Sequence, residues 1–201
     1  MKLYYSAGAC SLASHIVMYE AGLVFEAIAA PTKTHQLADG TDYYTINPLG
    51  YVPFLVLDDG RTLRETAAIL QYLADQAPSK KLAPAAGSFE RYQLQEWLHF
   101  IGTELHKSHS PLFTPGTPAE YKPMVRSTLM SRFEWINAQL ADKAYLMGEF
   151  SVADAYLYNV SRWGQYVSLD LSGLSHLVAF QQRMEARPGV QAALRAEGLI
   201  K

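Results

Sequence analysis

The hydrophobic pattern of the first 78 residues alternates between the period of strands and the period of helices. Residues 2–5 form a short aromatic run that predicts a strand, and apolar side chains then recur at helical spacing from Leu12 to Tyr19. A stop signal at Ala21-Gly22 precedes a second predicted strand over residues 23–29. A strand, a helix and a strand in this order predict two parallel strands joined by a right-handed crossover.

The pattern then predicts an antiparallel hairpin followed by a helix. Residues 31–47 are polar and weakly periodic, which favours a loop with one short helix. Residues 54–57 and 62–64 are expected to be strands that a tight turn joins. From Glu65 the spacing of apolar residues becomes helical. We therefore expect an α/β domain with a mixed four-stranded sheet over residues 1–78.

The strand signal disappears in the rest of the chain. Residues 79–87 contain proline, glycine and alanine without a clear period, which is typical of a linker, and residues 88–201 are predicted to form an all-helical domain. Its helices are expected over residues 89–107, 119–141, 174–186 and 188–196, with one more that begins at Ser151, where Asp154 completes a capping box. The prolines at 111, 115 and 118 are expected to break the chain between the first two helices.

Composition and charge exclude several classes of function. The chain has 201 residues, of which 49% are hydrophobic and 18% charged, so an ordinary globular core is expected. The formal net charge is −2 and no cluster of Lys and Arg stands out, which disfavours nucleic acid as a partner. Because no leader pattern and no apolar run of membrane-spanning length is present, we expect a cytoplasmic protein without a membrane partner.

Cys10 is the only cysteine, which excludes an internal disulfide and a dithiol redox centre. It lies at the predicted start of the first helix, where unpaired backbone N–H groups and the helix dipole favour a thiolate. Ser11 beside it could donate a hydrogen bond to that thiolate. A lone cysteine is also often a small buried hydrophobic residue, and serine is common at helix starts for structural reasons. The two residues alone therefore leave a catalytic and a structural interpretation open.

Two further pairs of residues have the character of a peptide-binding site. A cis peptide bond at Val52-Pro53 would turn the backbone N–H and C=O of Val52 outward, where an extended peptide could pair with them. Only about 5% of such bonds in folded proteins are cis, so this is a hypothesis. Glu65-Thr66 begins a helix directly after a strand and could bind the ammonium and the carboxylate of an α-amino acid. An acidic first helical turn is the structural alternative.

Polar side chains follow one side of the predicted helix over residues 89–107. His99, Thr103 and His106 recur at intervals of four and three residues, opposite the apolar side chains of the helix. A solvated face explains this stripe, although His106 also brings a titratable group near one helix end. His106 and His109 could bridge a metal, but no third ligand is apparent and we expect no metal site.

Five short motifs occur in an order that resembles the cytosolic glutathione transferases, and within that family the bacterial beta class. They are Gly8-Ala9-Cys10-Ser11-Leu12, Asn47-Pro48-Leu49-Gly50 with Val52-Pro53, Glu104-Leu105-His106-Lys107, Ala153-Asp154-Ala155-Tyr156 and Arg187-Pro188. The resemblance covers essentially the whole chain. It implies a thioredoxin-like domain followed by a helical bundle domain, and a cysteine where other classes use Tyr or Ser.

The resemblance implies that glutathione is the co-substrate and that Cys10 lies next to its sulfur. Ser11 and His106 would help to stabilise that sulfur, and Tyr5 could approach it from the first strand. In the implied reaction the site lowers the pKa of the glutathione thiol, and the thiolate attacks a small apolar electrophile. The electrophile pocket is expected to have Pro111, Leu112, Phe113 and Tyr166 in its walls. The family also implies a homodimer.

Other matched positions imply contacts along the glutathione peptide. Val52 would pair with its cysteinyl part, while Glu65 and Thr66 would receive the γ-glutamyl end. The implied binding residues are Cys10, His35, Val52, Pro53, Glu65, Thr66, His99, Thr103, Glu104, Leu105 and His106. His35 and His99 depart from the family pattern, which often has Lys and Asn there. Because a histidine holds the glycyl carboxylate as a cation only when protonated, we expect glutathione affinity to weaken as the pH rises past about 6.5.

The sequence leaves two other functions open. In one, Cys10 forms a mixed disulfide with glutathione during thiol transfer or peroxide reduction. In the other, the chain is a non-catalytic carrier that binds apolar ligands. Both would use the same fold, so the chemistry of the site has to distinguish them.

Overall fold

The structure is a computed structural model that describes residues 1–201. The chain forms two compact units: Met1–Ala83 with Ala186–Lys201, called the sheet unit here, and Pro84–Glu185, called the helical unit. The predicted division put residues 186–201 with the helical domain, whereas they belong to the sheet unit. The last helix packs on the first, and the Arg187 guanidinium donates two hydrogen bonds to Glu20, at 2.6 and 3.2 Å.

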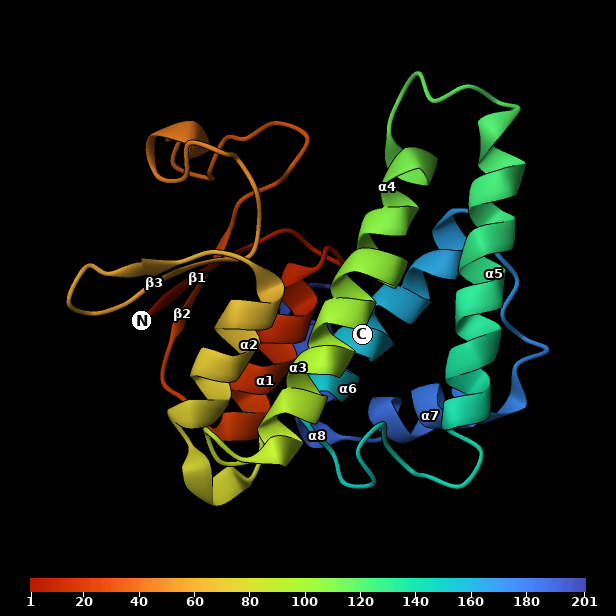
Figure 1. The fold of residues 1–201 in the computed structure, drawn as a ribbon. Helices are drawn as coiled ribbons and strands as arrows, with labels where there is room; N and C mark the ends of the chain where they lie inside the picture. The colour runs from red at the N-terminus through yellow and green to blue at the C-terminus, as the bar shows by residue number, and fades with distance from the viewer. The chain divides into compact units, whose positions relative to one another are not determined.

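The sheet unit contains a mixed four-stranded sheet, as the periodicity predicts (Figure 1). Its strands are β1 (Lys2–Tyr5), β2 (Glu26–Ala29), β3 (Phe54–Val56) and β4 (Thr62–Leu63), in the order β2-β1-β3-β4. β1 is parallel to β2, and β3 is antiparallel to both β1 and β4. The parallel pair follows from the strand-helix-strand connection and the last antiparallel pair from the tight turn, so the predicted thioredoxin-like topology is confirmed.

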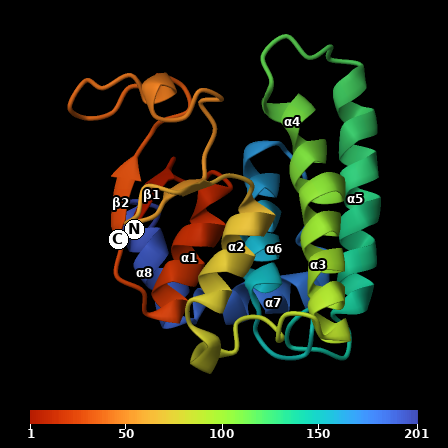
Figure 2. The same cartoon turned by 60° about the vertical axis from the view of Figure 1, so that its left-hand side comes forward.

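Three helices accompany the sheet: α1 (Ser11–Ala21), α2 (Thr66–Asp75) and α8 (Pro188–Ala196). Nine of the eleven residues of α1 are buried, because α2 packs on one side of it and α8 on the other (Figure 2). Gly22 ends α1 with a φ of 68°, a left-handed conformation that glycine adopts without a Cβ clash. Short 3-10 turns lie at Tyr43–Thr45 and Pro78–Lys80. The buried α1 gives Cys10, just before its first residue, a fixed position.

The first helical run of the helical unit is longer than the sequence predicts. α3 (Phe89–Phe100) continues through a π-helical turn at Ile101–His106 into α4 (Lys107–Phe113), as Figure 1 shows. The predicted break at Pro111 is therefore wrong, since this proline lies inside α4. A proline removes only one backbone donor, and the buried side chains of Leu105 and His109 hold this stretch against its neighbours.

The central helix of the helical unit is α6 (Val152–Ser161), since all ten of its residues are buried. α5 (Tyr121–Gln139) and α7 (Ser175–Glu185) complete the unit, and a 3-10 turn at Arg162–Tyr166, which the sequence pattern did not predict, extends α6. The predicted capping box of α6 is confirmed, because both its hydrogen bonds are present. None of the helices combines the length and the apolar character that crossing a bilayer requires.

Candidate functional site

Cys10 stands immediately before α1, as predicted, and its thiol points at the loop that precedes β3. The Sγ–H donates a hydrogen bond to the carbonyl oxygen of Val52 at 3.0 Å. Ser11 is fully buried, and its hydroxyl accepts from the backbone N–H of Ser6 and donates to the carbonyl of the same residue. The Ser11 hydroxyl thus closes the loop before Cys10. This contact favours the structural interpretation of Ser11.

The Cys10 thiol keeps its proton at neutral pH. Burial raises the pKa of Cys10 to about 11, although hydrogen bonds from the Thr66 hydroxyl and from the backbone N–H groups of Cys10 and Ser11 act in the opposite direction. The carboxylate of Glu65 adds to the increase. The expectation that the helix start favours a Cys10 thiolate is therefore wrong, because desolvation outweighs the donors at the helix N-terminus.

We expect Cys10 to react slowly with iodoacetamide in the folded protein. With a pKa of about 11, its thiolate fraction at pH 8 is roughly 200-fold below that of free cysteine. The alkylation rate, followed by mass spectrometry, should keep rising up to about pH 10 without a plateau. The urea-unfolded chain is the control, since its single cysteine should titrate normally. A plateau near neutral pH in the folded protein would contradict the protonated thiol.

The Val52-Pro53 peptide bond is cis, which confirms the hypothesis made from the sequence. The backbone around it is held by the side chains of Tyr43 and Asn47, which both donate to the carbonyl of Tyr51 at 2.8 Å. The carbonyl of Val52 does not point freely outward, because it accepts the Cys10 thiol proton. The structure therefore brings the predicted residues Cys10, Val52 and Pro53 together.

Glu65 and Thr66 complete this cluster from the start of α2. Glu65 caps the helix with a φ of 65°, a left-handed conformation that is uncommon for a residue with a Cβ and is typical of functional sites. Its side chain is exposed, whereas Thr66 is buried and contributes a hydrogen bond to the Cys10 thiol. The first turn of α2 therefore presents a carboxylate, a hydroxyl and helix N-terminal N–H groups beside Cys10.

His35 stacks on an aromatic ring that the sequence analysis did not single out. The ring centroids of His35 and Tyr44 are 4.5 Å apart with an interplanar angle of 24°. Gly50 makes room for this pair, since a Cβ there would lie 2.6 Å from Tyr44 and 2.9 Å from His35. The glycine of the Pro48-Leu49-Gly50 turn was the only sign in the sequence that side chains approach the backbone closely at this position. Tyr5, predicted near the thiol, packs against His15 with a centroid distance of 5.3 Å.

His106 lies in the helical unit, at the end of the π-helical turn, with a tyrosine as its partner. Its Nδ1 is 2.6 Å from the hydroxyl oxygen of Tyr156. Burial, helped by His109 and Lys107, lowers the pKa of His106 to about 4, so the imidazole is neutral at pH 7. Tyr156 was noted in the sequence only as the end of a motif, and no local signal indicated its contact with a residue 50 positions away.

The other predicted residues of α3 and the π-helical turn have partners within the helical unit. His99 is exposed with its Nδ1 2.7 Å from the carbonyl of Gln95, and Thr103 donates to the carbonyl of His99. Glu104 accepts a hydrogen bond from Arg132 of α5 at 2.8 Å. Leu105 is fully buried and so serves the core.

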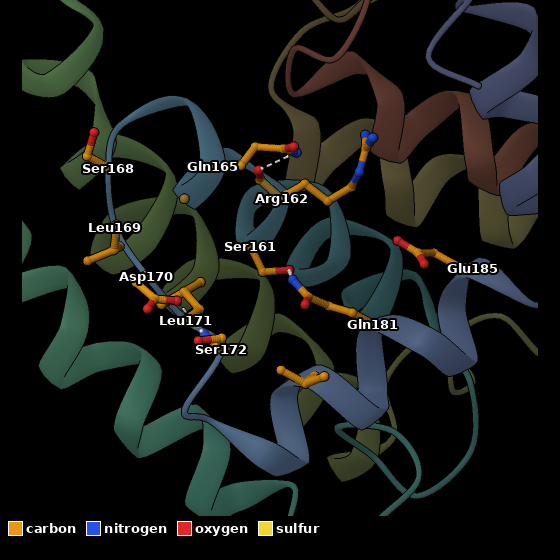
Figure 3. Close-up of a pocket in the computed structure, with 12 residues that line it drawn as sticks. Ser161, Arg162, Gln165, Ser168, Leu169, Asp170, Leu171, Ser172, Gln181 and Glu185 are labelled. Atoms are coloured by element: carbon orange, nitrogen blue, oxygen red, sulfur yellow. Dashed lines mark hydrogen bonds between the residues drawn. The ribbon is translucent and has the colours of Figure 1, made fainter. Parts of the chain in front are cut away.

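A pocket of about 700 Å³ lies in the helical unit beside the 3-10 turn at Arg162–Tyr166 (Figure 3). Polar and charged side chains line much of it, among them Arg162, Asp170, Gln181 and Glu185. The residues predicted to form the electrophile pocket, Pro111, Leu112, Phe113 and Tyr166, do not line it. Phe113 and Tyr166 are exposed, and the ring centroids of Phe113 and Trp163 are 5.9 Å apart. No group of three or more His, Cys, Asp or Glu side chains could hold a metal ion.

Family models and known proteins match nearly the whole chain. Residues 7–76 match the glutathione S-transferase N-terminal domain, and residues 100–188 match the C-terminal domain. The glutathione S-transferase GstA of Escherichia coli O157:H7 is 50% identical over 200 residues, which cover 99% of this chain and 100% of that protein.

Solved structures agree in fold and in sequence. A ternary complex of BphK, a bacterial glutathione S-transferase, has a TM-score of 0.96 and 56% identity, covering 98% of this chain and 100% of that chain. The beta-class enzyme of Sphingomonas chungbukensis (TM-score 0.96, 45% identity) and a sphingomonad enzyme complexed with glutathione (0.95, 44%) each cover 100% of both chains. The chain therefore belongs to the glutathione S-transferase family, and its likeness within that family is to the bacterial beta class.

Proposed function

We propose that the chain binds glutathione in the sheet unit and transfers the glutathione sulfur to small apolar electrophiles. The observation that carries this proposal is the meeting of Cys10, the Val52 backbone and the start of α2. These segments supply a thiol, an extended backbone and helix N-terminal donors, which suit the thiol, the peptide and the α-amino acid end of glutathione. The glutathione-bound sphingomonad relative supports the same co-substrate.

The γ-glutamyl end is assigned to the start of α2. Its carboxylate would accept hydrogen bonds from the first N–H groups of the helix and from the Thr66 hydroxyl, while its ammonium pairs with the exposed Glu65 carboxylate. The left-handed backbone of Glu65 sets the direction in which that carboxylate leaves the helix. Glu65 and Thr66 are therefore assigned to glutathione binding rather than to the chemical step.

Cys10 acts in this proposal as a neutral hydrogen-bond donor, whose S–H turns from the Val52 carbonyl to the sulfur of bound glutathione. Because burial raises its pKa to about 11, it keeps its proton while the glutathione thiol ionises. The thiol proton of glutathione leaves to water, the thiolate forms a carbon–sulfur bond with the electrophile, and the leaving group departs with the electron pair of the broken bond. The negative charge is therefore on the ligand sulfur, next to a donor that does not compete as a nucleophile.

The raised pKa also bears on the alternative in which Cys10 forms a mixed disulfide. That route needs a Cys10 thiolate as the attacking group, and the half-buried, carbonyl-bonded thiol supplies very little of it at neutral pH. The alkylation profile described above therefore separates the two candidates as well. The resemblance to a family of enzymes also favours turnover over passive transport of apolar ligands.

Several expectations from the resemblance stay predictions. They are the roles of Tyr5, Ser11, His35, His99, Thr103, Glu104, Leu105 and His106 toward glutathione, the apolar pocket walls, the cytoplasmic location and the homodimer. The homodimer would have twice the 22.4 kDa mass of one chain, which light scattering on the eluted protein measures.

We expect Glu65→Gln to raise KM for glutathione about tenfold, because a charge-assisted pair to the ligand ammonium is worth about 1.5 kcal/mol. The kcat with 1-chloro-2,4-dinitrobenzene should change little, since this contact holds the bound ligand and the transition state alike. Initial rates at varied glutathione give both constants.

Glu26→Gln is the matched control, because Glu26 is an exposed glutamate of the same unit, 3.6 Å from Lys2. An unchanged KM in Glu65→Gln would contradict the assigned γ-glutamyl site. The proposed function itself fails if the wild-type protein neither binds glutathione in calorimetry nor turns over the dinitrobenzene with it.

A further inference from the structure

The imidazole of His106 is held on two sides within the helical unit. Its Nδ1 lies 2.6 Å from the Tyr156 hydroxyl oxygen, and Tyr156 is itself buried in α6. The ring of Trp163 meets His106 nearly edge-on, with centroids 4.9 Å apart and an interplanar angle of 73°. Because the ring is fixed by packing and by one short hydrogen bond, its two nitrogens have different environments.

The chemistry of the two partners fixes the direction of that hydrogen bond. A phenol is a good donor and the unprotonated nitrogen of a neutral imidazole is a good acceptor, whereas the phenol oxygen is a weaker acceptor than a carbonyl. The short distance is typical of a bond with an O–H donor rather than an N–H donor. Tyr156 therefore donates to Nδ1, and in a neutral ring the proton is then on Nε2.

A neighbouring histidine shows the opposite arrangement. Nδ1 of His109 lies 2.8 Å from the backbone carbonyl of Leu105, which can only accept, so Nδ1 carries the proton and donates it. His109 is fully buried, and its Nε2 has no hydrogen-bond partner. His99 also faces a carbonyl, that of Gln95, through Nδ1. Among these three histidines, only His106 faces a hydroxyl at Nδ1.

We propose that Tyr156 is a positioning residue that fixes His106 in the Nε2–H tautomer. His106 then presents a neutral N–H donor, and it has no free basic nitrogen to take a proton from a thiol. The consequence that bears on the proposed function concerns the imidazole alone: a neutral N–H group can donate a hydrogen bond to an anion, but it does not act as a general base. Tyr156 itself acts only through His106.

The test is histidine-selective ¹H–¹⁵N correlation NMR on the ¹⁵N-labelled full-length protein at pH 7, with His106→Gln to assign the signals. We expect the wild-type protein to show His106 protonated at Nε2, and His99 and His109 protonated at Nδ1. In Tyr156→Phe, the His106 signals should move toward a mixture of the two tautomers.

Tyr158→Phe is the matched control, because Tyr158 is a buried tyrosine of the same helix whose hydroxyl donates to Glu185 at 3.4 Å. It should leave the His106 signals unchanged. The proposal is overturned if wild-type His106 carries its proton on Nδ1, if Tyr156→Phe leaves the tautomer unchanged, or if Tyr158→Phe shifts it equally. The first of these outcomes is read from the wild-type spectrum alone, so the proposal can be overturned even if the Tyr156→Phe variant folds poorly. An Nε2–H tautomer in a protein without glutathione turnover would refute the proposed function only.

Discussion

Asp154→Ala is expected to lower the free energy of unfolding by about 4 kcal/mol, because it leaves two buried backbone donors without this acceptor. Asp154 is fully buried at the start of α6, where Oδ1 accepts from the N–H of Leu146 at 2.9 Å and Oδ2 from the N–H of Ser151 at 2.8 Å. Each unsatisfied buried donor costs about 2 kcal/mol. The melting temperature should fall by roughly 8–16 °C in a chain of this size, as measured by calorimetry.

Two weaker substitutions at the same cap should give a graded series. Asp154→Asn keeps one acceptor oxygen and should lose about half as much stability. Ser151→Ala removes the hydroxyl that donates to the Asp154 carboxylate at 3.0 Å and accepts from the Asp154 backbone N–H, and it should cost about 1 kcal/mol. Asp142→Ala, at an exposed loop position of the same unit, should stay within about 0.5 kcal/mol of the wild type. If Asp154→Ala lowers the free energy of unfolding by no more than Ser151→Ala does, the hydrogen bonds from the two backbone donors to the Asp154 carboxylate do not make the expected contribution to stability.

The parts of the fold that were predictable depend on local signals. The change of period marks the strands and helices, Gly22 supplies the left-handed residue that ends α1, and Ser151 with Asp154 marks the start of α6. The place of α8 was not predictable in this way, because it depends on contacts such as the one between Arg187 and Glu20, which are 167 positions apart. Periodicity shows that a helix forms but not which surface it covers.

The site shows the same division between local and long-range information. Cys10, Val52 and Glu65 were identified because each stands at the end of a strand or helix, where backbone groups lack partners. The protonation state of Cys10 could not be inferred in the same way, because it depends on the Val52 carbonyl and on burial from several segments. The chemical character of a site residue depends on its distant neighbours, although its position is marked by its near ones.

Glu197→Ala is expected to destabilise the sheet unit by about 3 kcal/mol and to loosen the loop before Cys10. The Glu197 carboxylate is buried just beyond α8, where Oε2 accepts from the backbone N–H of Gly8 at 2.8 Å and Oε1 lies 3.0 Å from Nδ1 of His15. Nε2 of His15 has no partner, so the substitution would leave this buried imidazole without a hydrogen bond among aromatic rings. Two bonds to an ionisable group, at about 1.5 kcal/mol or more each, give the expected loss.

The loop connects this stability effect to the site. Gly8 is two residues before Cys10, so release of its N–H should let the loop open and expose the thiol. We expect iodoacetamide to alkylate Cys10 faster in Glu197→Ala than in the wild type under conditions where both remain folded, because local opening relieves the desolvation that raises the pKa of Cys10.

The alkylation rate of Glu197→Gln should lie between those of the wild type and Glu197→Ala, since its amide oxygen can still accept from Gly8. Glu134→Ala, at an exposed position of α5, serves as the control for stability and alkylation. If Glu197→Ala is clearly destabilised but its Cys10 is alkylated at the wild-type rate, the C-terminal segment stabilises α1 without holding the loop that carries Cys10.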